Sequence, residues 1–95
     1  MKILARTPVE DCFDGSAVYT YEVSEPWTSD NVRCLARLGT FEFFADFPRP
    51  LFRLRTDDGL FVNGVAGARD CRVVLPRTRR DAVQRQFEEV LMDEK

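Results

Sequence analysis

Arginine and phenylalanine are the residues of this sequence whose type and spacing indicate a function, and the function they indicate is binding. Twelve of the 14 basic residues are arginine, which forms planar, bidentate and stacked contacts that lysine does not. Between Thr40 and Leu75 apolar residues recur at a period of two, and this stretch holds most of the phenylalanines together with Arg53 and Arg55. Aromatic residues and arginine are enriched at binding hot spots, so the composition points to a binding surface.

Nucleophilic and metal chemistry has little support, because the sequence contains no histidine. Histidine is the commonest general base and the usual partner of a catalytic cysteine or serine. The three cysteines, Cys12, Cys34 and Cys71, lie far apart and form no C-x-x-C pair. We expect buried, reduced thiols.

One pair of carboxylates could act as acid and base, since Glu42 and Asp46 project from the same face of a predicted strand. Arg53 and Arg55 on the neighbouring strand would hold both carboxylates ionised, whereas a general acid must carry a proton. We therefore predict a protein that is not an enzyme, with no catalytic residue, no metal and no cofactor.

The chain of 95 residues is expected to form a single domain over residues 1–95. It has no apolar run of about 18 residues, and its first residues lack the apolar core of a signal peptide, so we expect a cytoplasmic protein that does not bind membranes. Charge is uneven: residues 1–31 hold six acids and two bases, residues 32–80 five and ten, and residues 81–95 five and two.

A β-meander over residues 40–75 must position the arginines and phenylalanines. Thr56-Asp57-Asp58-Gly59-Leu60 has the composition of a three-residue hairpin loop with Gly59 in the left-handed conformation, which pairs Thr56 with Leu60. Pairing core with core in the preceding hairpin then sets the following residues opposite each other: Phe43 and Leu54, Ala45 and Phe52, Glu42 and Arg55, Phe44 and Arg53. Gly64 is expected to form a bulge, and a last strand to run from Cys71 to Leu75.

The remaining elements are predicted to pack on this meander. Residues 2–7 and 17–23 are expected to form a hairpin. Residues 28–38 fit either a strand or a helix, and an N-cap at Thr28 favours the helix. A second helix should begin in the capping-box pattern from Thr78 to Asp81 and bury an apolar stripe. The predicted fold is α+β, a two-layer sandwich of an antiparallel, meander-rich sheet with two helices on one face.

The open face of the meander is the first candidate site, with four residues that form an aromatic and arginine patch: Phe44, Arg53, Arg55 and Phe61. It would bind a protein partner or a second copy in a homodimer, either directly or through an edge strand. The structural alternatives are that the N-terminal hairpin covers this face, or that the arginines only shield the rings. Nucleic acid is not the expected partner, because the chain is net acidic and lacks the RNP1 signature.

The second candidate is an anion site at the start of the C-terminal helix, formed by Arg77, Arg79 and Arg80. Cations are disfavoured at a helix N-terminus, and three of them suggest a use, such as holding a phosphate or carboxylate. The structural alternative is that they point into water, balanced by Asp81. The leading function is therefore a small non-enzymatic interaction module, and the alternative is a small-anion or nucleotide-phosphate binding domain.

Overall fold

Six antiparallel strands, one 3-10 helix and one α-helix form the fold in a computed structural model that describes residues 1–11 and 15–92. The elements are β1 (Ile3–Asp11), β2 (Ala17–Val23), η1 (Asn31–Arg37), β3 (Thr40–Phe44), β4 (Leu51–Arg55), β5 (Phe61–Val65), β6 (Asp70–Leu75) and α1 (Arg80–Met92). The predicted α+β class is confirmed. Within the described ranges, no helix is long and apolar enough to span a membrane.

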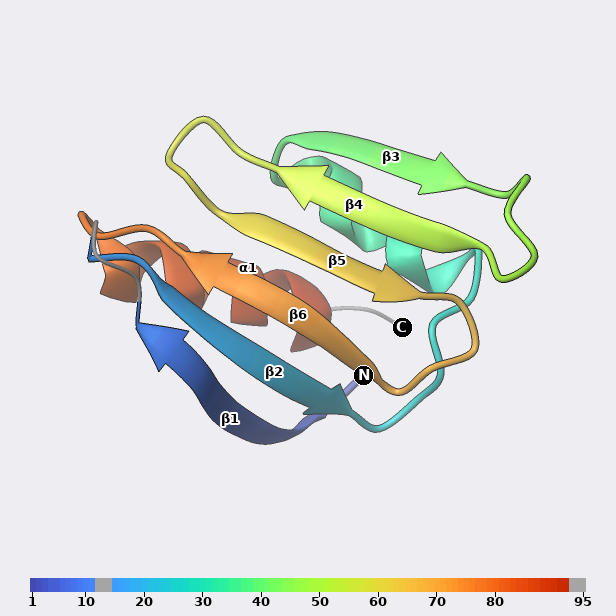
Figure 1. The fold of residues 1–95 in the computed structure, drawn as a ribbon, viewed down its shortest axis with the longest axis horizontal. Helices are drawn as coiled ribbons and strands as arrows, with labels where there is room; N and C mark the ends of the chain where they lie inside the picture. The colour runs from blue at the N-terminus through green and yellow to red at the C-terminus, as the bar shows by residue number, and fades with distance from the viewer. Residues whose placement is uncertain (12–14, 93–95) are drawn as a thin grey trace.

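The strands make one sheet in the order β1-β2-β6-β5-β4-β3 (Figure 1). Strands β3 to β6 follow one another as the predicted meander, and the hairpin of β1 and β2 joins it through β2 and β6. The sheet therefore has two edges, one formed by β1 and the other by β3.

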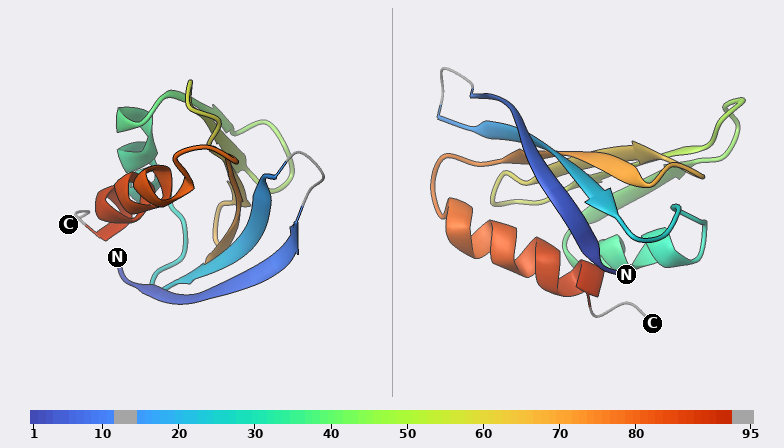
Figure 2. Two further views of the ribbon diagram at one scale, coloured as in Figure 1. Left: turned by 90° about the vertical axis from the view of Figure 1, so that its left-hand side faces the viewer. Right: turned by 90° about the horizontal axis from the view of Figure 1, so that it is seen from below.

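Both helices lie on the same side of the sheet (Figure 2). The core between them and the sheet is almost entirely apolar, and its largest fully buried side chains are Trp27, Tyr21, Phe52 and Phe87. Apolar burial of this kind is the main favourable term in folding. The opposite side of the sheet, which we call the outer face, is formed by the side chains that alternate with these core residues along each strand.

The hairpin loop between β4 and β5 is as predicted. The Thr56 amide donates to the Leu60 carbonyl at 3.0 Å, and Gly59 has a φ of 98°, a conformation that glycine adopts without steric cost. The register follows from the loop, with Arg55 opposite Phe61, Leu54 opposite Val62 and Arg53 opposite Asn63.

The predicted register between β3 and β4 is wrong by two residues. Phe43 lies opposite Phe52 instead of Leu54, so Ala45 lies beyond the strand, and Glu42 faces Arg53 while Phe44 faces Leu51. A shift of two residues leaves every side chain on its predicted face. The two faces were therefore predicted correctly, and only the cross-strand partners changed.

Gly64 does not form the predicted bulge, because its strand pairs regularly with β4 and sets Gly64 opposite Phe52. A Cβ atom at Gly64 would lie 2.7 and 2.8 Å from two carbon atoms of the Phe52 ring. The glycine is thus needed to admit that ring, which is fully buried and lies 5.0 Å from the Trp27 ring between centroids.

The irregular strand is β1, which extends beyond the predicted residues 2–7 to Asp11. Its register with β2 shifts twice, between Ile3 and Ala5 and between Pro8 and Glu10. The extra residues at the two shifts are Leu4 and Val9.

Residues 31–37 form a helix, as the sequence favoured, and not the alternative strand. The helix is a 3-10 helix, which is wound more tightly than an α-helix. The N-cap of this helix is Asp30 and not the predicted Thr28, although the Asn31 amide donates to the Thr28 hydroxyl at 3.0 Å. The Asn31 side chain in turn accepts from the Thr28 amide at 2.7 Å. Cys34 is buried, as expected for its thiol, whereas Ala36 is exposed, because a 3-10 helix has about three residues per turn instead of 3.6.

The C-terminal helix begins at Arg80, one residue later than the predicted capping box requires. Arg79 before it has a φ of 58°, in the left-handed region, which ends any helical path from Thr78. The predicted apolar stripe is otherwise present, with Val83, Phe87 and Leu91 buried.

An ion-paired network fastens α1 to the N-terminal hairpin. The Arg6 guanidinium donates to both carboxylate oxygens of Glu88, at 2.8 and 2.5 Å. The Tyr21 hydroxyl donates to Glu88 at 2.8 Å and accepts from the Gln84 amide at 2.7 Å. The bonds from Arg6 lower the pKa of Glu88, and burial raises the pKa of Tyr21 to about 12.

Replacing Gly64 by alanine should lower the free energy of unfolding by about 1–3 kcal/mol, the usual cost of overpacking a core. The new methyl group would overlap the Phe52 ring. Urea unfolding of Gly64→Ala alone and in a Phe52→Leu background measures the coupling. The alanine should cost less when the ring is absent, and an equal loss in both backgrounds would contradict this explanation.

Glu88 should make the stability depend on pH. Its folded pKa lies below the ordinary value of 4.5, so the unfolded chain binds a proton more readily than the folded protein. The stabilisation that Glu88 contributes is therefore fully present above its ordinary pKa, and it is lost as the pH falls through the lower folded pKa. At neutral pH Glu88→Gln should cost about 1–3 kcal/mol, and its acid unfolding curve should be flatter than that of the control Glu89→Gln, measured by thermal unfolding across pH.

Candidate functional site

The outer face of the sheet carries a continuous polar row across all six strands. Each member lies directly opposite the next in the strand pairings, in the order Thr7, Thr20, Arg72, Asn63, Arg53 and Glu42. Apolar side chains flank this row on the meander half. On one side Phe44 lies opposite Leu51, and Leu51 lies opposite Val65, while Phe61 lies on the other side.

These apolar side chains surround an open hollow of about 400 Å³. Its lining is formed by Phe44, Phe47, Leu51, Phe52, Arg53, Phe61, Asn63, Gly64 and Val65. Most of the exposed lining is apolar. Phe47 at its margin is 52% exposed, although moving a phenylalanine side chain out of water lowers the free energy. The hollow is therefore the part of the outer face best suited to bind an apolar group.

Charge at the hollow is provided by two arginines that share one carboxylate. Arg53 Nε lies 3.4 Å and Arg55 Nη2 3.9 Å from Glu42 Oε1. Two positive charges and one negative charge leave this part of the face net positive. All three side chains are substantially exposed, so these pairs contribute little to stability.

Arg53 also lies over the ring of Phe44, with its guanidinium carbon 5.2 Å from the ring centroid. The Phe44 ring meets the Phe47 ring edge to face, at 6.1 Å between centroids. The Nε atom of Arg53 is buried and makes no hydrogen bond with any residue the structure describes. The cation–π contact predicted as a shielding alternative is thus present for Phe44, and Phe47 is still left largely in solvent.

Three of the four residues predicted for this site line the hollow, namely Phe44, Arg53 and Phe61. Arg55 lies on the same face opposite Phe61, but outside the lining. The sequence reasoning missed Leu51, Val65 and Phe47. The first two follow from the alternation that placed Arg53 and Asn63, whereas Phe47 lies in the β3–β4 connection, where no period predicts its direction.

The N-terminal hairpin does not cover this face, which was the other structural alternative. Strand β2 pairs with β6 in the plane of the sheet and β1 pairs with β2 beyond it. Figure 2 shows both helices on the opposite side. The hollow is therefore open to solvent among the residues that the structure describes.

Two of the three arginines of the predicted anion site lie against Gly15, and the third lies apart from them. Arg80 donates to the carbonyl oxygens of Gly15 and Pro76, and the aliphatic part of Arg77 packs against Gly15. Arg79 lines a separate hollow with Asp57 and Asp58. The anion-binding hypothesis stays a prediction, and the geometry supplies no point where the three side chains meet.

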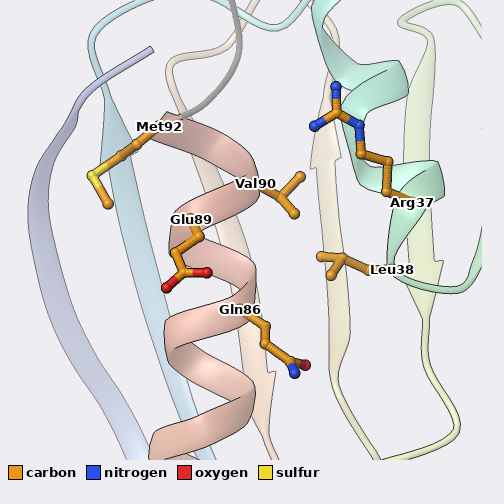
Figure 3. Close-up of a pocket in the computed structure, with 6 residues that line it drawn as sticks. All are labelled: Arg37, Leu38, Gln86, Glu89, Val90 and Met92. Atoms are coloured by element: carbon orange, nitrogen blue, oxygen red, sulfur yellow. The ribbon is translucent and has the colours of Figure 1, made fainter.

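A larger open groove of about 770 Å³ lies between α1 and η1 on the helix side of the sheet. Leu38 and Val90 face each other across it, while Glu89 and Met92 lie on the other flank of α1 (Figure 3). The polar side chains along the groove do not converge on one point.

Two of the cysteines, Cys34 and Cys71, are buried, whereas Cys12 lies outside the described residues. Burial raises the pKa of Cys71 to about 12, so the thiolate needed for nucleophilic attack is scarce at neutral pH. Among residues 1–11 and 15–92 no cluster of three or more cysteine, aspartate or glutamate side chains is arranged to hold a metal ion.

Comparison with known proteins adds no relative: no family model, no curated protein and no solved structure matches the chain.

Cys71 should resist alkylation in the folded protein. At about pH 8, near the ordinary value for a free thiol, iodoacetamide should modify Cys71 more than about tenfold more slowly in buffer than in guanidinium chloride. Peptide mass spectrometry separates Cys71 from Cys34 and Cys12. Equal rates in the two solvents would show that the Cys71 side chain is accessible in the native state.

Proposed function

We propose that the protein is a small non-enzymatic interaction module that binds a protein partner through the outer face of its meander. The observation that supports this most directly is the apolar hollow with Phe47 at its margin, on a sheet face that the helices leave open. Exposed apolar patches on soluble domains commonly mark protein interaction sites.

The composition of the hollow agrees with a protein partner. Phenylalanine and arginine lie together in its lining, and aromatic residues and arginine are enriched at binding hot spots. The polar row beside it supplies Asn63 and Arg53 as hydrogen-bonding groups, which an interface needs around its apolar centre. A nucleic-acid partner would need more accumulated positive charge than one excess arginine beside Glu42.

The charge also indicates what the partner presents. An apolar side chain would fill the hollow, and a carboxylate next to it would meet Arg53 or the largely exposed Arg55. Opposite potentials across an interface favour association and reject other partners. We infer a partner with an aromatic or branched apolar residue beside an aspartate or glutamate, encountered in the cytoplasm as the sequence predicts.

Substitution of the hollow should abolish partner binding without unfolding the protein. Tagged wild-type protein, Phe44→Glu and Phe61→Ser are used for affinity purification from the native host with quantitative mass spectrometry. We expect one set of proteins to be enriched about tenfold by the wild type and lost with both variants, as expected for hot-spot residues worth 1–2 kcal/mol or more.

The matched control is Val9→Glu, which changes a 53% exposed apolar residue on β1, outside the hollow. It should retain the same proteins. Light scattering coupled to size-exclusion chromatography tests whether the partner is a second copy. If all variants enrich the same proteins at equal thermal stability, and all remain monomeric, the outer face is not the binding surface.

A further inference from the structure

The two edges of the sheet differ in how they are protected against pairing with another strand. In β1 each of the two register shifts leaves an apolar side chain exposed to solvent: Leu4 is 63% exposed and Val9 is 53% exposed. Pro8 between them has no amide hydrogen to donate. Bulges and prolines are the devices by which edge strands avoid pairing with other chains.

Strand β3 has none of these devices. It pairs with β4 in regular register over all five of its residues, and its sequence, TFEFF, contains neither proline nor lysine. The sheet ends at β3, as Figure 1 shows at its upper edge. Among the described strands this edge is therefore the one whose geometry suits the addition of a further strand.

The helix side of this edge offers an apolar floor. An open hollow of about 420 Å³ lies there, lined by Ser29, Arg33, Ala36, Phe41 and Phe43. The two phenylalanines come from β3 and are only half buried, and Ala36 of η1 is exposed. A strand added beside β3 would place alternate side chains over this floor, because side chains directly across a ladder lie about 5 Å apart.

The outer side of the same edge carries Phe44 and a cluster of charged side chains with a net positive charge. Glu42 is the central residue of β3 there, and it already binds both Arg53 and Arg55. The side chain of Arg55 is 60% exposed. The other alternate side chains of an added strand would meet this excess positive charge, which favours carboxylates.

We propose that β3 receives an extended segment of a partner protein as a seventh strand, with apolar residues on the helix side alternating with acidic residues on the outer side. Pairing of this kind gives affinity through main-chain hydrogen bonds and specificity through alternate side chains. The proposal rests on the proposed function in that the ligand is a protein, and it assigns a second surface to it.

Charge argues for a foreign segment over a second copy of this chain. Residues 32–55, which include β3 and its surroundings, contain five arginines and two acids. Two copies joined through their β3 edges would bring these two basic segments close together, and juxtaposed like charges disfavour association.

A synthetic peptide tests the proposal on the intact protein. The probe is the acetylated and amidated peptide Glu-Val-Glu-Leu-Glu-Val-Glu-Leu-Glu, titrated into isotope-labelled protein and followed by NMR. The amides of Phe41 to Phe44 should shift and become protected from hydrogen exchange. A peptide with the same residues reordered to remove the alternation, and one with lysine for glutamate, should each bind at least about tenfold more weakly.

Backbone methylation separates strand addition from docking by side chains alone. Successive amides of a strand point to opposite edges, so N-methylation of either the glutamates or the apolar residues of the peptide blocks one edge at a time. One of these two peptides should lose binding by about tenfold or more. If both bind like the unmodified peptide, or if the signals that shift belong to β5 and not to β3, the proposal is overturned.

Phe61→Ser distinguishes this proposal from the function proposed above, because Phe61 lies on β5, two strands from the edge. The variant should still bind the peptide. If Phe61→Ser no longer captures the partner but still binds the peptide, both proposals are supported. If Phe61→Ser loses the partner and no peptide binding is seen with any protein, only the strand-addition proposal is overturned. If the peptide binds but partner capture does not depend on Phe61, only the outer-face proposal is contradicted.

Discussion

Pairing between β2 and β6 is the constraint on which the rest of the structure depends. The two strands face each other over six residue pairs, from Ala17 opposite Leu75 to Glu22 opposite Asp70. Their pairing turns a hairpin and a meander, each too small to bury its apolar side, into one sheet wide enough for α1 to lie across. The Arg6, Glu88 and Tyr21 network then fastens the helix to the hairpin. Both sheet edges, and therefore the contrast between β1 and β3, are consequences of this order.

Local turn chemistry explains which registers could be predicted from the sequence. The loop around Gly59 has a composition that sets the pairing of β4 with β5 directly. The connection from Ala45 to Pro50 has no such signal, and a hydrophobic pattern of period two is unchanged by a shift of two residues. The faces of β3 were therefore predictable and its partners were not. Gly64 was misjudged for a related reason, since its role depends on the Phe52 ring across the ladder, which only the three-dimensional pairing reveals.

The candidate site was predictable to the same extent. Phe44, Arg53 and Phe61 lie on one face because they alternate with core residues, a property of the sequence alone. Phe47 comes to them through an irregular connection. The arginines after Pro76 show the opposite case, because their closeness in sequence suggested one cluster. Arg77 and Arg80 both lie against Gly15, whereas Arg79, in the left-handed conformation, lines a separate hollow.

Trp27 gives the molecule an internal optical reporter of its assembly. It is the single tryptophan, it lies between β2 and η1, and its indole Nε1 donates to the Asp70 carbonyl at 2.9 Å. Its backbone also exchanges hydrogen bonds with Gly67 and Ala68 in the β5–β6 turn. The indole thus becomes buried when a segment from the first third of the chain meets Phe52 of β4 and a turn some forty residues later. Closing a contact of such long range is slow relative to forming local hairpins, so Trp27 emission during refolding would report the late joining of the two halves and not the earlier formation of the meander.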